Sequence, residues 1–168
     1  AFCFVLFGSV LASGCTNVPD KVTPVTPFEL SRYLGTWHEI ARLDHSFEQG
    51  LTEVTAQYSL REDGGVKVIN RGYNVEEELW EEAEGKAYFV ADTNTGRLKV
   101  SFFGPFYAPY KIIQLDSNYK YALVSSGKDY LWILSREKSI PENIKNQYLN
   151  YAKTLNYNTK NLIWVEHK

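Results

Sequence analysis

Apolar and aromatic residues alternate with polar ones in short segments along most of the chain. In one segment Val54, Ala56, Tyr58 and Leu60 take every second position, which is typical of a strand with one buried face. Gly, Pro, Asn and Asp separate such segments. The pattern predicts eight strands, at Thr36–Leu43, Thr52–Leu60, Val66–Tyr73, Glu82–Ala91, Leu98–Phe103, Tyr110–Leu115, Tyr119–Ser125 and Tyr130–Arg136.

The links between these segments indicate how the strands pair. Most links are short and rich in turn residues, as at Glu62–Gly65 and Gly127–Asp129, whereas a parallel pair needs a crossover of a dozen or more residues. Successive strands are therefore antiparallel, and they can remove their exposed edges by closing into a barrel that holds one small ligand. The longer links Asp44–Leu51, Asn74–Glu81 and Gly104–Pro109 are expected to surround an open mouth.

A helix and a ninth strand are predicted after the barrel. Ser139–Glu142 has the spacing of a capping box, and apolar residues then recur at helical spacing as far as Leu155, so one helix face can pack on the barrel. Leu162–Val165 is a final apolar segment. The expected fold is all-β, an eight-stranded antiparallel up-and-down β-barrel with one C-terminal α-helix packed outside.

The first residues indicate export. Ala1–Gly14 contains no charged residue and is shorter than the about 20 apolar residues that span a bilayer, so it is interpreted as a signal peptide. Leu11–Cys15 has the small residues and the cysteine of a bacterial lipobox. We therefore expect Cys15 to carry a lipid anchor, and Thr16 after it favours the outer membrane, on its periplasmic side.

The two cysteines exclude an internal disulfide in the mature chain. Cys3 lies in the segment that we expect to be removed, and Cys15 is expected to be acylated. Residues 15–27 contain three prolines and are predicted to form a tether. The folded domain is expected at residues 28–168 and must be held together by its core alone.

Composition narrows the classes of function. The 168 residues are 44% hydrophobic and 23% charged, with a net charge of −2, which suits one globular domain and argues against a disordered chain or a nucleic-acid binder. The 12 Tyr, nine Phe and four Trp favour an apolar ligand pocket. The acidic run Glu76–Glu84 is interpreted as a solvated rim whose charge disfavours anionic head groups.

The sequence carries no strong catalytic or metal-binding motif. It lacks G-x-S-x-G, H-E-x-x-H, C-x-x-C and a P-loop. His38, His45 and His167 do not have the spacing of metal ligands. We therefore expect a binding protein and not an enzyme, with no cofactor and no metal.

A tryptophan and an arginine are predicted to close one end of the barrel. Trp37 lies near the start of the first strand and Arg136 ends the eighth, and these two strands are neighbours in a closed antiparallel barrel. The guanidinium can then stack on the indole, an interaction worth about 0.5–2 kcal/mol. The pair would form the barrel floor.

Several stretches resemble the lipocalin family, specifically its bacterial outer-membrane lipoproteins. The resemblance implies a lipophilic ligand inside the barrel, and for the bacterial members a fatty acid or lysophospholipid that is stored or transported at the envelope. The resembling stretches are Gly35–Arg42, Val54–Tyr58, Val68–Tyr73, Gly85–Ala87, Lys99–Phe106, Asp116–Tyr119 and Asp129–Arg136.

Strand alternation selects the residues expected to meet the ligand. If Trp37 and Arg136 point inward, every second residue of each strand does so too. Small residues in this set leave volume, and its aromatics supply contact area; the alternative is that these side chains fill a solid core. The predicted ligand-binding residues are Ala56, Tyr58, Val68, Asn70, Gly85, Ala87, Val100, Phe102, Tyr110, Ile112, Trp132 and Leu134.

Two other functions stay open at this point. A lipid-modifying enzyme would need a polar pair in the pocket, for which Asn70 and Tyr110 are the best candidates. A haem or tetrapyrrole carrier would use His38, His45 or a tyrosine. A homodimer is also compatible with the sequence.

Overall fold

The predicted fold class is confirmed. A computed structural model describes residues 22–168, so the predicted signal peptide, Cys3 and the acylation site Cys15 lie outside the described residues. The strands are β1 (Gly35–Leu43), β2 (Leu51–Leu60), β3 (Val66–Asn74), β4 (Leu79–Phe89), β5 (Arg97–Phe103), β6 (Phe106–Leu115), β7 (Tyr121–Ser126), β8 (Tyr130–Ser135) and β9 (Leu162–Trp164). The helices are α1 (Leu30–Tyr33), α2 (Glu142–Thr154) and the short η1 (Thr159–Asn161).

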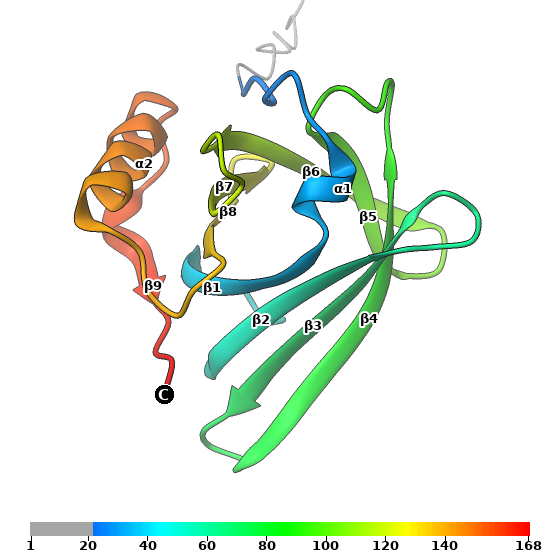
Figure 1. The fold of residues 1–168 in the computed structure, drawn as a ribbon. Helices are drawn as coiled ribbons and strands as arrows, with labels where there is room; N and C mark the ends of the chain where they lie inside the picture. The colour runs from blue at the N-terminus through cyan, green and yellow to red at the C-terminus, as the bar shows by residue number, and fades with distance from the viewer. Residues whose placement is uncertain (1–21) are drawn as a thin grey trace, which may run out of the picture.

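Strands β1–β8 form a closed antiparallel barrel. Each strand pairs with the next, and β1 pairs with both β8 and β2, which closes the ring seen in Figure 1. The first half of β1 pairs with β2, whereas its second half pairs with β9. Because strand directions alternate, the β1–β2, β3–β4, β5–β6 and β7–β8 links share one end of the barrel, and the remaining links share the other.

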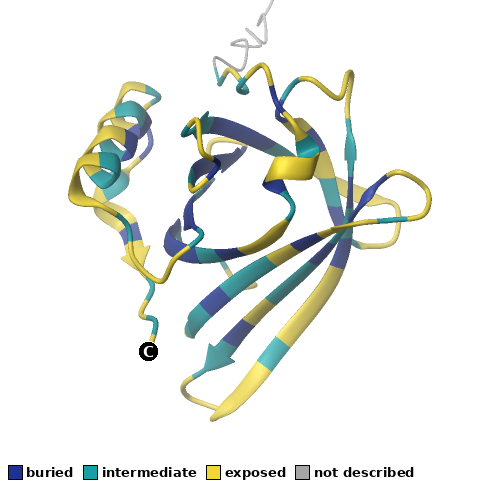
Figure 2. Ribbon diagram, viewed as in Figure 1, coloured by how far each residue is buried: buried dark blue, intermediate teal, exposed yellow. Residues whose placement is uncertain are grey.

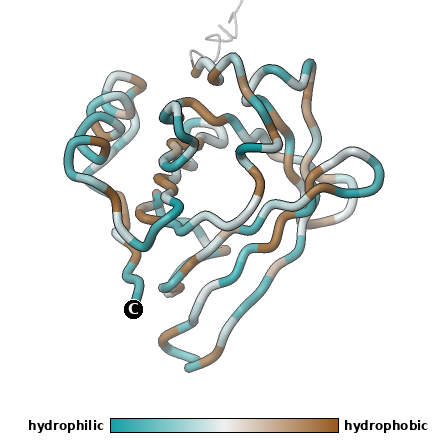
Figure 3. The backbone as a smooth tube through the Cα atoms, in the orientation of Figure 1, coloured by the Kyte–Doolittle hydropathy of each residue, from teal (hydrophilic) through white to brown (hydrophobic). Residues whose placement is uncertain are grey.

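Two apolar clusters lie on the two sides of the barrel wall. One lines the inside of the barrel and includes Trp37 and Val68. The other lies between the wall and α2, where Leu123 and Ile133 pack with Tyr148. Apolar positions recur at intervals along the barrel strands (Figure 3). Helix α2 lies outside the barrel and has one exposed side and one buried side (Figure 2). In the described part of the chain no helix is long and apolar enough to cross a membrane.

A bulge in β1 decides which of its side chains face the inside. The pairing with β8 shifts between Glu39 and Ala41, so that Ile40 and Ala41 both join the cluster under α2. Arg42 then turns back toward Glu39 on the inner side of the wall. One extra residue in a strand has this effect because it reverses the alternation that follows it.

The expectation of three long links around the mouth is wrong for two of them. β4 begins at Leu79, and β6 begins at Phe106, where Phe103 pairs with Phe106 across a two-residue turn. Pro109 had indicated a loop, but it lies in β6 and pairs with Lys99 of β5. The pairing of β6 with β7 begins only at Lys111. The missing N–H of Pro109 therefore interrupts no hydrogen bonds between β6 and β7. Only the β1–β2 link remains long.

The predicted capping box is also wrong. α2 begins at Glu142 with Pro141 at its N-cap and no side-chain cap. The backbone carbonyl of Ser139 accepts a hydrogen bond from the Ser135 hydroxyl at 2.8 Å instead, so this turn is tied to the end of β8. The ninth strand forms as expected, and the short helix α1 was not anticipated.

The chain before α1 lies on the barrel. The Val25 N–H donates to the carbonyl of Ile112 at 2.8 Å, and the Val25 carbonyl accepts from Gly96 at 2.9 Å. The Phe28 N–H donates to the carbonyl of Asn94 at 2.8 Å. The described end of the predicted tether, residues 22–27, is therefore held against the β4–β5 link and does not hang free of the domain.

Candidate ligand-binding cavity

The barrel floor is built from Trp37, Arg136 and α1. Trp37 is completely buried, and the Arg136 guanidinium lies 3.9 Å from the centre of its ring. Arg136 also donates to the backbone carbonyls of Thr36 at 3.1 Å and Arg32 at 2.9 Å. α1 lies across this end of the ring (Figure 1). The floor therefore joins three chain segments through one guanidinium.

The inside of the barrel is hollow. An inner chamber of about 100 Å³ adjoins an outer chamber of about 460 Å³ that opens at the mouth. These volumes suit a lipid tail. The residues that line both chambers form a waist between them. They are Glu48, Asn70, Val100, Phe102, Tyr110 and Trp132.

Most of the predicted ligand-binding residues line this cavity. Gly85 and Ile112 do not. A Cβ atom at Gly85 would lie 2.7 Å from the Phe102 ring, so the absence of a side chain at Gly85 leaves the space that the Phe102 ring occupies. Ile112 is fully buried beside Gly96. The residues that line a chamber are Ala56, Tyr58, Val68, Asn70, Ala87, Val100, Phe102, Tyr110, Trp132 and Leu134; their contact with a ligand stays a prediction.

Three tyrosine hydroxyls form a chain in the inner chamber. The Tyr110 hydroxyl lies 2.7 Å from that of Tyr33 and 2.7 Å from that of Tyr58. Burial raises the pKa of each of the three well above its usual value, so all stay neutral. Two hydrogen bonds use two of the three hydroxyl hydrogens, which leaves one for a further acceptor. Sequence reasoning missed Tyr33 because it missed α1.

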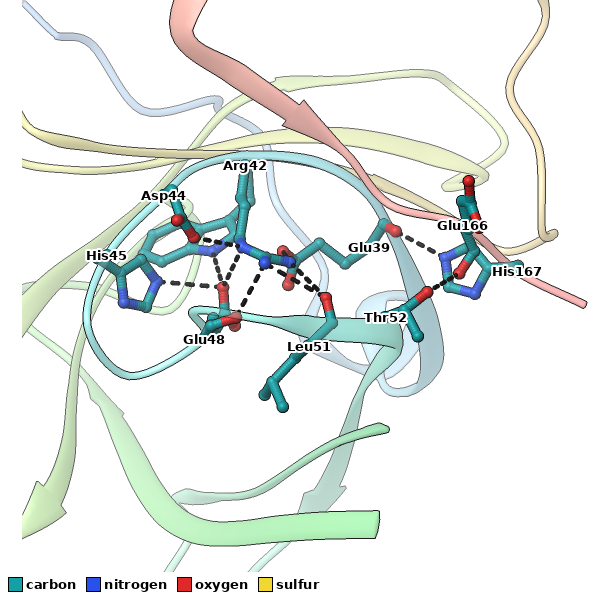
Figure 4. Close-up of polar contacts among 10 residues, drawn as sticks. Glu39, Arg42, Asp44, His45, Glu48, Leu51, Thr52, Glu166 and His167 are labelled. Atoms are coloured by element: carbon teal, nitrogen blue, oxygen red, sulfur yellow. Dashed lines mark hydrogen bonds and ion pairs between the residues drawn. The ribbon is translucent and has the colours of Figure 1, made fainter. Parts of the chain in front are cut away.

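A buried cluster of charged residues lies at the cavity wall, where Glu39 and Glu48 line the inner chamber. We define the carboxyl cluster as Glu39, Arg42 and Glu48 (Figure 4). Arg42 is 2% exposed; it donates to Glu39 at 3.3 Å and to the backbone carbonyl of Glu48 at 2.8 Å. It also lies 3.2 Å from Asp44. The bulge in β1 brings Arg42 to this position.

The two carboxyl groups of the cluster have opposite electrostatic environments. Burial, and then the charge of Glu48, raise the pKa of Glu39 well above its usual range. Burial also opposes ionisation of Glu48, but hydrogen bonds and charge from His45, and a hydrogen bond from Trp132, lower its pKa overall. Ionisation is therefore disfavoured at Glu39 and favoured at Glu48.

Glu48 connects the long β1–β2 link to the barrel wall. Its Oε2 lies 3.1 Å from His45 Nε2 and accepts a hydrogen bond from the indole N–H of Trp132 at 3.2 Å. The link is thus held over the cavity by a buried side chain. Strand alternation could not reveal this arrangement, because Glu48 lies in a link. The presence of Glu39 and Arg42 in the mostly apolar strand β1 was a signal that charged side chains are buried here.

His38 and His45, the histidines considered for a tetrapyrrole carrier, lie apart, whereas Asn70 and Tyr110 both line the waist. His38 lies beside His167 at 5.2 Å between ring centres, and alternation with Trp37 and Glu39 places it on the outside of the barrel. His45 lies at the mouth. Within residues 22–168 no group of three or more His, Cys, Asp or Glu side chains could hold a metal ion.

Fold and cavity together define a small β-barrel protein with an internal apolar chamber. Residues 28–167 match the model of the lipocalin-like domain. The chain belongs to the lipocalin family.

Individual relatives agree with this assignment. The chain is 50% identical over 167 residues to outer membrane lipoprotein Blc of Vibrio cholerae, with 98% of each chain covered. It is 50% identical to the Blc protein of Escherichia coli, covering 94% of this chain and 89% of that one, and 38% identical to apolipoprotein D of Rattus norvegicus, covering 77% and 71%. The solved structure of insecticyanin from Manduca sexta superposes with a TM-score of 0.71 at 26% identity, covering 89% and 86%.

Proposed function

We propose that this protein binds a fatty acid or lysophospholipid in its barrel, and stores or transports it at the bacterial outer membrane. Membership of the lipocalin family supports the binding of a lipophilic molecule. The names of the relatives as outer membrane lipoproteins support the location and an anchor on Cys15. The observation that carries the proposal is the apolar cavity, which runs from the mouth to Tyr110.

An acyl chain supplies the driving force. Moving each methylene out of water is worth about 0.8 kcal/mol, so a dozen give about 10 kcal/mol before the cost of immobilisation. Ala56, Val68 and Ala87 form an apolar part of the inner chamber wall. The tail is placed there, with the polar end toward the mouth.

The charges of the wall favour a head group without net negative charge. Glu48 faces the waist as a carboxylate, and in the outer chamber Glu81 and Glu82 outnumber the one arginine, Arg71. A fatty-acid anion would lie against these side chains, whereas a zwitterionic lysophospholipid carries an ammonium that complements them. Asn70 at the waist supplies a neutral hydrogen-bonding group. A zwitterionic lysophospholipid is therefore the better ligand of the two.

Filling the inner chamber tests the proposal. Ala56→Trp places an indole where the tail is expected, and should weaken binding of fluorescently labelled lysophosphatidylcholine at least tenfold in titrations. Leu60→Trp is the matched control, because Leu60 is 64% exposed on the same strand, and should bind as the unmodified protein does. Equal affinity in both variants contradicts the proposed site.

Native mass spectrometry of the purified protein identifies the ligand. A co-purified lipid of unchanged mass agrees with storage or transport. Conversion of an added lipid, lost in Asn70→Ala, would instead indicate an enzyme, and a Soret band on titration with haemin would indicate a tetrapyrrole carrier.

A further inference from the structure

The hydroxyls of Tyr33, Tyr58 and Tyr110 lie together at the inner end of the cavity, and we call them the tyrosine triad. Tyr33 comes from α1, Tyr58 from β2 and Tyr110 from β6, and all three residues line the inner chamber. The rings of Tyr33 and Tyr58 stack with their centres 5.5 Å apart, and the ring of Tyr33 lies 5.0 Å from that of Trp37 at the floor. Packing of the rings therefore fixes where the hydroxyls lie.

The tyrosine triad has one more hydrogen than its own hydrogen bonds use. Among residues 22–168 these hydroxyls hydrogen-bond only one another, at 2.7 Å from Tyr110 to Tyr33 and 2.7 Å from Tyr110 to Tyr58. Whichever hydroxyl donates in each pair, the two bonds consume two hydrogens, and the third has no acceptor in the protein. A buried donor without an acceptor is costly, so this arrangement favours a bound molecule that brings an acceptor oxygen.

We propose that the tyrosine triad is a subsite for an uncharged oxygen on the inner part of the acyl chain, so that the protein prefers acyl chains that carry a hydroxyl or keto group there. This rests on the proposed function, which places the tail in the inner chamber. A hydroxyl or keto oxygen accepts the third hydrogen, whereas a methylene group leaves it unpaired. A methylene group that displaced a water molecule from the triad would have the same defect, because it cannot replace the hydrogen bonds of the water.

The surroundings of the triad favour an uncharged oxygen over a carboxylate. Burial raises the pKa of Tyr58, and the negative charge of Glu48 raises it further, so the same two effects oppose a second anion at this place. One donor hydrogen is also too few for a carboxylate, whose two oxygens accept about four hydrogen bonds. A fatty acid that entered with its carboxylate first would therefore fit poorly, which agrees with a head group toward the mouth.

The inner chamber makes the preference depend on position along the acyl chain. Val66, Leu98 and Leu134 line the same chamber and have no hydrogen-bonding side-chain atom. A hydroxyl group placed against them loses its hydrogen bonds to water without replacement. The carbon that reaches the tyrosine triad can carry an oxygen without that cost. Selectivity for position therefore distinguishes a subsite from a general tolerance of polar chains.

Lysophosphatidylcholines that differ only in the acyl chain test the subsite. A plain hexadecanoyl chain is compared with hexadecanoyl chains that carry one hydroxyl group at different carbons, by displacement of fluorescently labelled lysophosphatidylcholine. A hydroxyl at one position in the inner half of the chain should leave the affinity equal to that of the plain chain or higher. At the other inner positions it should weaken binding about tenfold. Equal affinity at every inner position, or a loss at every inner position, overturns the subsite.

Removing the hydroxyls while keeping the rings gives the matched variant. Tyr33→Phe/Tyr58→Phe/Tyr110→Phe leaves no unpaired hydroxyl, so it should fold, which circular dichroism establishes. It should bind the plain chain at least as tightly as the unmodified protein does, and the preferred hydroxylated chain about tenfold more weakly. Tyr148→Phe is the control, because the Tyr148 hydroxyl donates to the carbonyl of Tyr121 on the α2 side of the wall. It should leave the ratio of the two affinities unchanged.

The plain chain separates this inference from the proposed function. Binding of the plain chain with no preferred hydroxyl position overturns the subsite alone, and so does a triple variant that keeps the ratio of affinities of the unmodified protein. Binding of none of these lipids overturns the proposed function and the subsite with it. The comparison of positions uses the unmodified protein, so its result holds whether or not the triple variant folds.

Discussion

The two ends of the barrel use aromatic residues in opposite ways. At the floor, Trp37 is completely buried under Arg136, whose donors reach backbone carbonyls of several segments. At the mouth, Phe103 and Phe106 point into solvent. The floor therefore contributes stability, and the mouth keeps apolar surface available. The same class of residue is thus buried for stability at one end and left exposed at the other.

The largest expected effect separates the floor from the mouth. Trp37→Ala removes a fully buried indole, and should lower the free energy of unfolding by about 3–5 kcal/mol. Phe106→Ala, at 78% exposure, should change it by less than about 0.5 kcal/mol. Denaturation with urea measures both. Similar losses in the two variants would mean that the mouth also supports the fold.

The second effect concerns the carboxyl cluster, which lies between the two ends. Arg42→Met removes the buried guanidinium that lies 3.7 Å from Glu48 and donates to Glu39 and to the backbone carbonyl of Glu48, and should cost about 3 kcal/mol in urea denaturation. Adding Glu48→Gln should restore part of the loss, because one of the buried charges that Arg42 balances is gone. Asp44→Asn is the control: Asp44 is 35% exposed, so its pairing with Arg42 should contribute less than about 1 kcal/mol. If the losses of unfolding free energy from Arg42→Met and Glu48→Gln simply added in the double variant, Arg42 and Glu48 would not interact.

Sequence pattern predicted the floor better than the cluster. Trp37 lies near the start of β1, and Arg136 directly follows the end of the neighbouring strand β8. Closing the barrel was therefore sufficient to bring the two residues together. Arg42 faces inward only because the bulge between Glu39 and Ala41 reverses the alternation of β1. Strict alternation from Trp37 assigns Arg42 to the outer face. Glu48 lies in a link, where no alternation applies.

The cavity shows the same division. In regular strands such as β3 the prediction placed Val68 and Asn70 correctly, because alternation fixes which residues face inward once one of them is assigned. Gly85 and Ile112 also belong to the inner side, but whether an inward residue lines a hollow or packs beneath it depends on its neighbours, here Phe102 and Gly96. The length of the β5–β6 link was mispredicted because Pro109 was placed in the link, whereas β6 already begins at Phe106 and runs through Pro109.

The smallest effect is a pH dependence that belongs to the carboxyl cluster and not to the floor. The pKa of Glu39 is raised on folding, so its contribution to stability is fully present below the usual value of about 4.5 and is lost as the pH rises from there. Glu39→Gln should remove this slope, which is at most about 1.4 kcal/mol per pH unit. Urea denaturation at pH 4, 5.5 and 7 measures it.

Glu48 and Trp37 provide the two controls for that slope. The pKa of Glu48 is lowered on folding, so its contribution is present at neutral pH and is lost as the pH falls, which is the opposite sign. Glu48→Gln should therefore lose stability mainly at pH 7, while Trp37→Ala should lose the same amount at every pH because no titrating group is removed. If Glu39→Gln and Glu48→Gln changed the slope in the same direction, the pKa values of the two carboxyl groups would not be shifted in opposite directions. The wall of the cavity would then lack the fixed negative charge on which the proposed preference for a zwitterionic ligand depends.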